Sequence, residues 1–154
     1  MNRAALAADS KQWETARQLY AGVLGSQLKT LGESHPSVFN TRNLLALLSA
    51  RTGDEREGLI QFEELLSDER RILGPDHPIT LITRQNRAGL LARMGRRGEA
   101  FAEYEQLLSD ERRVLGEDHP DTLASASNLA ADLRRLGELD RARVLDEDIL
   151  ARRR

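Results

Sequence analysis

The chain lacks cysteine and has few aromatic residues, which make up 4% of its 154 residues. Without cysteine it can form neither disulfides nor thiolate metal sites, so a reducing cytoplasm is the default compartment. Lysine is also scarce, because Lys11 and Lys29 are the only lysines among 23 basic residues. Such arginine-rich usage is typical of a GC-rich genome and favours a bacterial setting.

Long apolar runs and an excess of one charge are missing as well. No apolar run approaches the roughly 18 residues of a membrane-spanning helix, and residues 1–6 are too poor in apolar side chains for a signal peptide. We therefore expect no membrane association. The net charge is −2, which argues against the phosphate attraction on which nucleic-acid binders depend.

One short string occurs three times at a spacing of 42 residues. It begins at Leu31, Leu73 and Leu115, and each copy starts with Leu-Gly and ends with His-Pro. A fixed period of this length is the signature of a stacked repeat architecture. The chain is therefore predicted to be a single array: a partial repeat 1–35, repeats 36–77 and 78–119, and a truncated final repeat 120–154.

Each repeat is predicted to be a pair of helices. A proline at 36, 78 or 120 suits the first position of a helix, and the histidine before it can cap the free amides there. Glycines end the first helices, and apolar residues recur at helical spacing without any alternation of period two, so the fold class is all-α. The expected helices span 36–52, 55–73, 78–94, 97–115, 120–136 and 138–152. In the partial repeat, we expect residues 1–10 to be the end of a first helix and residues 13–31 to be its partner.

The second helices carry a small residue followed by an aromatic one at fixed places. The small residues should let neighbouring helices approach closely, and the aromatic residues should fill the space beyond. The small residues are Ala16, Gly58, Ala100 and Ala142, and the aromatic ones are Tyr20, Phe62 and Tyr104. Asp146 takes the aromatic place in the last helix, so this helix either caps the array with a polar face or lacks a neighbour.

These motifs together resemble the tetratricopeptide repeats (TPR) of the 42-residue kind found in kinesin light chains and in actinomycete signalling proteins. The resemblance is carried by the Leu-Gly-x-Asp-His-Pro linkers, the triplet Asn128-Leu129-Ala130 with its echoes at 86–88 and 44–46, and the glycine followed five residues later by a small residue. It covers essentially the whole chain. It implies a right-handed superhelical solenoid of antiparallel helix pairs, with the first helix of each pair lining the concave side. Arg42, Arg84 and Arg87 depart from the family pattern, and we expect their stems to be buried with the heads at the surface or the middle repeat to bend.

The resemblance also implies a peptide-binding groove. Its amide side chains could satisfy an extended backbone, its small residues would leave room, and its arginine rim would favour an acidic partner or a chain carboxylate. The candidate groove residues are Asn40, Asn43, Leu47, Arg51, Ile82, Gln85, Gly89, Arg93, Ser127, Ala131, Arg134 and Arg135. Simpler interpretations remain open, since cations in a last helical turn complement the helix dipole, the amides suit a solvated face, and Gly89 suits a close helix contact.

Catalytic and metal-binding patterns are not found. The three histidines hold equivalent places in successive repeats, so they should lie on the order of 8–10 Å apart, whereas zinc needs its nitrogens about 2 Å from one ion. No nucleophile, metal-binding or nucleotide-binding motif is present. The sequence predicts no cofactor and no enzyme.

The predicted function is a non-catalytic scaffold that binds a protein or peptide in its groove, as part of a larger regulatory protein. The alternative is a self-assembling structural or cytoskeletal adaptor, similar to kinesin light chain, that forms homo-oligomers through its open repeat ends.

Overall fold

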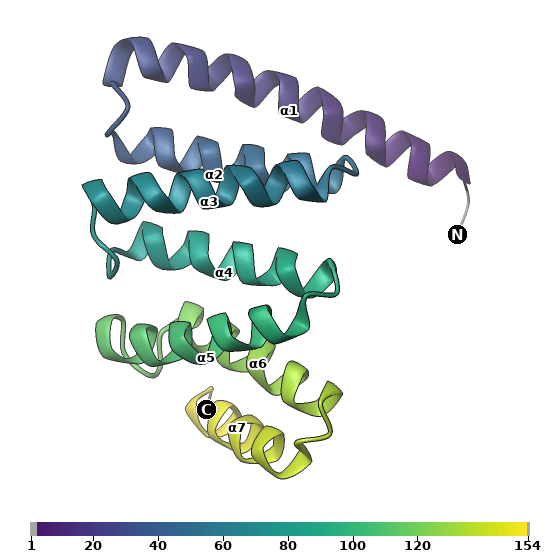
Figure 1. Cartoon of the computed structure of the whole chain (residues 1–154), viewed down its shortest axis with the longest axis vertical. Coiled ribbons are helices and arrows are strands. Elements are labelled where there is room, and N and C mark those ends of the chain that lie inside the picture. Colours follow the sequence, from purple (N-terminus) through teal and green to yellow (C-terminus); the bar gives the residue numbers. More distant parts are fainter. Residues whose placement is uncertain (1–2, 154) are drawn as a thin grey trace. The chain divides into compact units, whose positions relative to one another are not determined.

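The computed structural model describes residues 3–153, with side chains from residue 9 onward, as seven helices and no strand in that range (Figure 1). The helices are α1 (Arg3–Leu31), α2 (Pro36–Arg51), α3 (Glu55–Ile72), α4 (Pro78–Arg93), α5 (Arg97–Val114), α6 (Pro120–Arg135) and α7 (Leu139–Arg152). The all-α fold class is confirmed, and α2 to α7 begin and end within one residue of the predicted bounds. Among the described residues, no helix combines the length and hydrophobicity needed to cross a bilayer.

The prediction for the first repeat is wrong. Instead of two helices with a break near residue 11, α1 is one helix of 29 residues. The glycines that follow α2, α4 and α6 all have positive φ, a conformation that glycine adopts at little cost. Lys11 occupies the place 42 residues before Gly53, the first of these glycines, so nothing in this stretch ends the helix.

The predicted histidine caps are confirmed. Nδ1 of His35, His77 and His119 accepts a hydrogen bond from the backbone amide two residues later, at 3.2 Å in each case. A proline follows each histidine at the first helical position. The histidines therefore define where α2, α4 and α6 begin.

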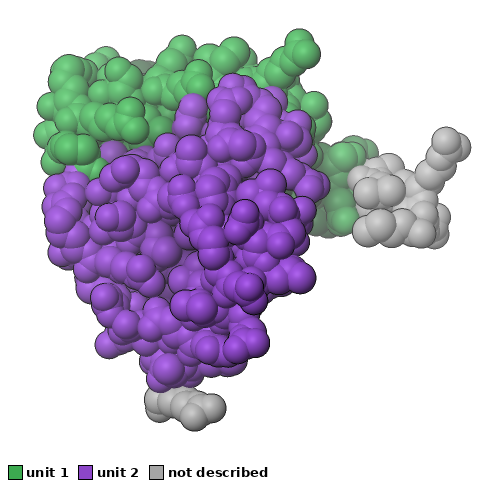
Figure 2. Space-filling view, turned by 60° about the horizontal axis from the view of Figure 1, so that its bottom comes forward, with its two compact units in different colours: residues 1–75 green, residues 76–154 purple. Residues whose placement is uncertain are grey.

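The helices fall into two compact units, residues 1–75 and 76–154 (Figure 2). In unit 1, α2 packs against both α1 and α3. In unit 2, each helix from α4 to α7 packs against the next one in the chain. The proposed continuation of one array through both units stays a prediction.

The core of unit 1 contains a very close helix contact. A Cβ atom placed on Gly58 would lie 2.8 Å from the Cβ atom of Ala50 and 2.9 Å from the carbonyl oxygen of Ala46. The predicted role of a small residue at this place is therefore confirmed for the α2–α3 pair. Phe62, one turn along α3, is completely buried.

Unit 2 repeats this plan with alanine in place of glycine. Ala88 on α4, Ala100 on α5 and Ala130 on α6 are buried, and Tyr104 is buried one turn after Ala100. At the aromatic place of α7, the carboxylate of Asp146 pairs with Arg134 on α6.

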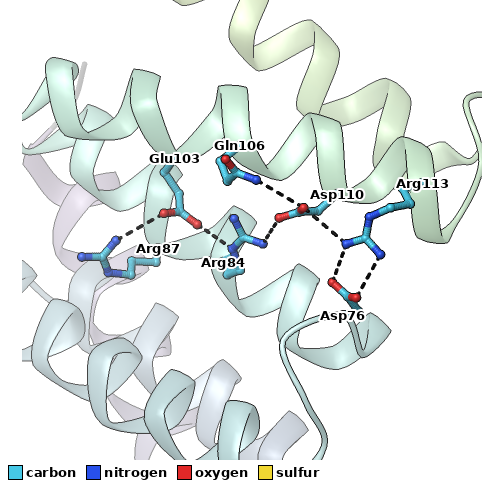
Figure 3. Close-up of polar contacts among 7 residues, drawn as sticks. All are labelled: Asp76, Arg84, Arg87, Glu103, Gln106, Asp110 and Arg113. Carbon is cyan, nitrogen blue, oxygen red and sulfur yellow. Dashed lines mark hydrogen bonds and ion pairs between the residues drawn. The ribbon is translucent and has the colours of Figure 1, made fainter.

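Arg84, one of the arginines that depart from the family pattern, is bound differently from our expectation. The Arg84 side chain, guanidinium included, is buried and α4 is an unbroken helix from Pro78 to Arg93. Its Nε donates to Glu103 and its Nη1 donates to Asp110, both at 2.7 Å (Figure 3). Ion pairs thus replace the expected exposed head and the expected bend.

The network around Arg84 extends to the surface. Arg113 donates to both oxygens of Asp76, at 3.0 and 2.8 Å, and also contacts Asp110 at 3.5 Å (Figure 3). Arg87 lies 4.0 Å from the other oxygen of Glu103. These contacts join α4, α5 and the loop before α4.

Candidate functional site

Unit 2 contains a cavity of about 480 Å³ formed by α4, α5 and α6. Four of its lining residues were predicted from the sequence: Gly89 and Arg93 on α4, and Ala131 and Arg135 on α6. The other lining residues are Ala92, Arg97, Tyr104, Asn128 and Asp132. Its volume lies within the range of pockets that bind small ligands or side chains.

Small residues leave this cavity open. Gly89 has no side chain, and a Cβ atom added there would lie 3.4 Å from the Tyr104 hydroxyl. Ala92 follows on α4, and Ala131 lines the α6 side. Any longer side chain at these places would take up part of the space.

Positive charge dominates the lining. Arg93, Arg97 and Arg135 contribute three guanidinium groups, whereas Asp132 contributes the one carboxylate among the described lining residues. Arg135 donates to Oδ1 of Asp132 at 3.0 Å. The second oxygen, Oδ2, is buried and accepts no hydrogen bond within the described part of the chain. The carboxylate therefore positions Arg135, and the cavity keeps a net positive charge.

The Tyr104 hydroxyl is neutral at physiological pH. Burial of the ring, followed by the nearby charge of Asp132, raises the pKa of Tyr104 to about 12. A neutral phenol can still donate a hydrogen bond. Guanidinium groups bind carboxylates through forked, charge-assisted hydrogen bonds, so this lining suits an acidic group of a ligand.

The remaining predicted residues of unit 2 lie outside the cavity lining. Gln85 Nε2 donates to the Ser125 hydroxyl at 3.0 Å and so connects α4 to α6. Ser127 donates to the carbonyl of Leu123 on its own helix at 2.9 Å. Ile82 is exposed on α4, and Arg134 pairs with Asp146 on α7.

The four predicted residues on α2 belong to unit 1. Asn40 and Arg51 are exposed, Leu47 is half-buried, and Asn43 is buried. The guanidinium of Arg51 lies over the Trp13 ring, 4.7 Å from its centroid. Asn43 therefore presents little surface to a ligand, while the other three remain accessible to different extents.

Sequence reasoning missed five lining residues: Ala92, Arg97, Tyr104, Asn128 and Asp132. Tyr104 was interpreted only as a core residue, yet its hydroxyl reaches the cavity next to Gly89. A signal for Asp132 was present in the sequence, because the equivalent places in the preceding repeats are the buried leucines Leu48 and Leu90. An acidic residue in an otherwise apolar row marks a departure from simple core packing.

A second cavity, of about 430 Å³, lies in unit 1 and was not predicted. Its lining comes from α1, α2 and α3: Glu14, Arg17, Gln18, Ala21, Leu24, Arg42, Leu45, Ser49, Gln61 and Glu64. Arg17 is paired with Glu14 at 2.8 Å and Arg42 with Asp68 at 2.7 Å. Its charges are thus largely neutralised, in contrast to the cavity of unit 2.

Nowhere among the described residues do three or more acidic, histidine or cysteine side chains gather as a metal site would require.

Comparison with protein families identifies the class of the protein. The family model described as tetratricopeptide repeat matches residues 38–109 and 85–154 of this chain. The chain therefore belongs to the tetratricopeptide repeat family, and its fold is an all-α helical solenoid of this type. Comparison with curated protein sequences gives no significant match.

Solved structures narrow the resemblance to kinesin light chain-like repeats. A Podosopora anserina protein described as a kinesin light chain with nearly identical TPR-like repeats is 25% identical, with a TM-score of 0.71, over 99% of this chain and 76% of that one. A single-substitution variant of that protein is 26% identical, with a TM-score of 0.72, over 98% and 76% of the two chains. BtubC (BKLC) from P. vanneervenii has a TM-score of 0.79 at 22% identity, over 92% of this chain and 56% of that one, and shows the fold alone. The predicted resemblance to 42-residue, kinesin light chain-type repeats is confirmed.

Proposed function

We propose that the protein is a non-catalytic scaffold whose unit 2 cavity binds an acidic side chain or chain carboxylate of a protein partner. Tetratricopeptide repeats suggest a protein-interaction scaffold, and folds of this kind are typically non-catalytic. The observation that carries the proposal is the grouping of Arg93, Arg97 and Arg135 around a cavity kept open by Gly89 and Ala131.

The chemistry of the lining supports a segment of polypeptide as ligand. Three guanidinium groups would hold the acidic group, while the Tyr104 hydroxyl and the Asn128 amide could bond to backbone groups of the same segment. The volume of about 480 Å³ accommodates one or two side chains.

We propose that the chain acts in the reducing cytoplasm of a bacterium, as part of a larger regulatory protein. The lack of cysteine and the arginine-rich composition support this setting. A cytoskeletal adaptor like a kinesin light chain is the second candidate, favoured by the similarity to the Podosopora anserina repeats.

A peptide selection on the whole chain tests the proposal. A random peptide library is selected against the protein, and the enriched peptides should carry aspartate, glutamate or a free carboxyl terminus. Fluorescence anisotropy then compares the wild type with the variant Arg93→Glu/Arg135→Glu. Loss of even one charge-assisted bond corresponds to about tenfold weaker binding, so we expect at least this change.

Two further variants make the result specific. Arg93→Gln/Arg97→Gln leaves the Asp132–Arg135 pair intact and should also weaken binding. The matched control is Arg143→Glu/Arg153→Glu, which makes the same change of charge at exposed places outside the cavity. Equal affinity of the cavity variants and the wild type, with folding verified by circular dichroism, would exclude the cavity as the binding site.

A further inference from the structure

The cavity of unit 2 contains a buried hydroxyl group that makes no hydrogen bond within the described part of the chain. Tyr104 is 4% exposed, and its hydroxyl lies at the cavity beside Gly89. No described residue accepts a hydrogen bond from this hydroxyl or donates one to it. Buried tyrosine hydroxyls usually have a hydrogen-bond partner. The hydroxyl of Tyr104 is therefore available to an acceptor atom of a ligand.

Two further donors of the same lining are available as well. Arg97 stands at the start of α5, and Asn128 lies on α6. The side chains of these two residues form no ion pair or hydrogen bond with any other described residue. Both residues are exposed, so water can satisfy their N–H groups in the free protein. A ligand can therefore bind to them without breaking a contact within the protein.

Donors outnumber acceptors among the described lining residues. The donors are three guanidinium groups, the neutral hydroxyl of Tyr104 and the amide of Asn128. The one carboxylate belongs to Asp132, whose Oδ1 accepts from Arg135 and whose Oδ2 is buried. The cavity therefore suits a ligand group that accepts hydrogen bonds at several atoms.

The lining also carries more than one positive charge. Three guanidinium groups lie around the cavity, and the carboxylate of Asp132 compensates one of them, which leaves a surplus of two among the described lining residues. A carboxylate ligand has one charge and two oxygens, so it compensates half of this surplus and leaves the Tyr104 hydroxyl for the backbone of the bound segment. A phosphate monoester carries about −1.5 to −2 charges at pH 7 and has three acceptor oxygens. It therefore matches both the charge and the number of donors.

We propose that the acidic group bound in this cavity is a phosphorylated side chain of the protein partner. This inference rests on the function proposed above, because it names the chemical class of the ligand for the same cavity. Guanidinium groups form forked, charge-assisted hydrogen bonds with phosphate, and the Tyr104 hydroxyl donates to the third oxygen. Phosphorylation then converts a weakly bound segment of the partner into a strongly bound one.

Peptide arrays incubated with the whole chain test the proposal. Three arrays share the same random sequences and differ only in a central phosphoserine, glutamate or serine. Phosphoserine peptides should bind at least about tenfold more tightly than their glutamate counterparts, because they form at least one more charge-assisted bond, and serine peptides should bind most weakly. Equal affinity for phosphoserine and glutamate would overturn the phosphate ligand and leave the proposed function in place. Equal affinity for all three would contradict both.

Two variants assign the preference to the cavity. Arg97→Gln reduces the positive charge of the lining, and Tyr104→Phe keeps the ring but removes the hydroxyl, so each should lower the ratio of phosphoserine to glutamate affinity. The matched controls Arg153→Gln and Tyr20→Phe make the same changes at exposed places outside the cavity and should keep the wild-type ratio. A wild-type ratio in both cavity variants, with folding verified by circular dichroism, would overturn the proposal.

Phosphorus nuclear magnetic resonance of one bound phosphoserine peptide reports on the surroundings of the phosphate itself. Nearby guanidinium groups favour the dianion, so the second pKa of the phosphate, about 6 in the free peptide, should be lower in the complex. An unchanged pKa would mean that the phosphate stays in solvent and would overturn the proposal. Inorganic phosphate should compete only at a much higher concentration than the peptide, because it lacks the rest of the segment. Competition at equal concentration would show that the cavity binds a free anion instead of a phosphorylated partner.

Discussion

Arg42 in unit 1 and Arg84 in unit 2 hold the same repeat position but have different surroundings. The Arg42 side chain is 26% exposed and pairs with Asp68 at 2.7 Å. The Arg84 side chain is 8% exposed and pairs with both Asp110 and Glu103. The two acceptors Asp68 and Asp110 are themselves equivalent, so the additional partner makes the difference.

That partner depends on one residue of the second helix. Glu103 in unit 2 stands where unit 1 has Gln61, and Gln61 instead accepts a hydrogen bond from Ser49 at 3.1 Å. A buried guanidinium needs its charge compensated, and two carboxylates do this for Arg84. Equivalent arginines thus differ in burial and in their ion pairs because of the residue opposite them.

Replacing each of these two arginines by alanine should have very different effects on the free energy of unfolding. Arg84→Ala leaves Glu103 and Asp110 partly buried without their cation, so we expect a loss of about 3–5 kcal/mol in the free energy of unfolding. Arg42→Ala removes a more exposed pair and should cost about 1 kcal/mol. Urea denaturation of the two variants provides the measurement. Equal losses would show that the additional ion pair of Arg84 does not contribute.

The comparison extends to Glu69 and Glu111, which are buried at the same place in α3 and α5. Burial raises the pKa of Glu111 to about 7, although a hydrogen bond from Ser125 opposes this shift. The folded state therefore holds a proton that the unfolded state releases near its ordinary pKa of 4.5. Between these values the folded state binds more protons, so the free energy of unfolding falls as the pH rises.

Glu111→Gln should remove this pH dependence. Relative to the wild type, the variant should gain roughly 3 kcal/mol between pH 4 and pH 8, because glutamine stays neutral. The control Glu105→Gln changes an exposed residue of the same helix and should follow the wild-type curve. A Glu111→Gln curve parallel to that of the wild type would contradict a neutral Glu111 in the folded protein.

Two helical glycines should respond to alanine in opposite directions. Gly58→Ala places a methyl group 2.8 Å from Ala50 and should cost about 1–3 kcal/mol in unit 1. Gly89→Ala makes an ordinary contact of 3.4 Å with Tyr104, so the better helix propensity should stabilise unit 2 by up to about 1 kcal/mol.

The same Gly89→Ala change should weaken peptide binding, because it narrows the cavity. Unchanged peptide binding would show that Gly89 does not lie at the ligand.

Most of the fold could be predicted because its signals are local. A histidine-proline pair begins α2, α4 and α6, and a glycine follows each helix from α2 to α6. The error in α1 arose where the repeat register was extended over Lys11, a residue that does not end a helix. The local sequence there indicates an unbroken helix, whereas the analogy with the other repeats indicated a turn.

The site could be predicted only in part. Gly89, Arg93, Ala131 and Arg135 follow from the 42-residue register and line one cavity. The side chains of Tyr104 and Asp132 reach that cavity because of contacts between helices, which periodicity does not reveal. The pairing of Arg84 with Glu103 likewise depends on side-chain geometry across 19 residues of sequence.

Nuclear magnetic resonance with a selected acidic peptide would show where on the protein the peptide binds. Gly89 provides a distinct backbone amide signal, and Ala92 and Ala131 provide methyl signals in the cavity of unit 2. We expect the peptide to shift these three signals and to leave those of Ala21 and Leu24, in the cavity of unit 1, unchanged. Shifts confined to Ala21 and Leu24, with the Gly89 and Ala131 signals unmoved, would contradict this expectation.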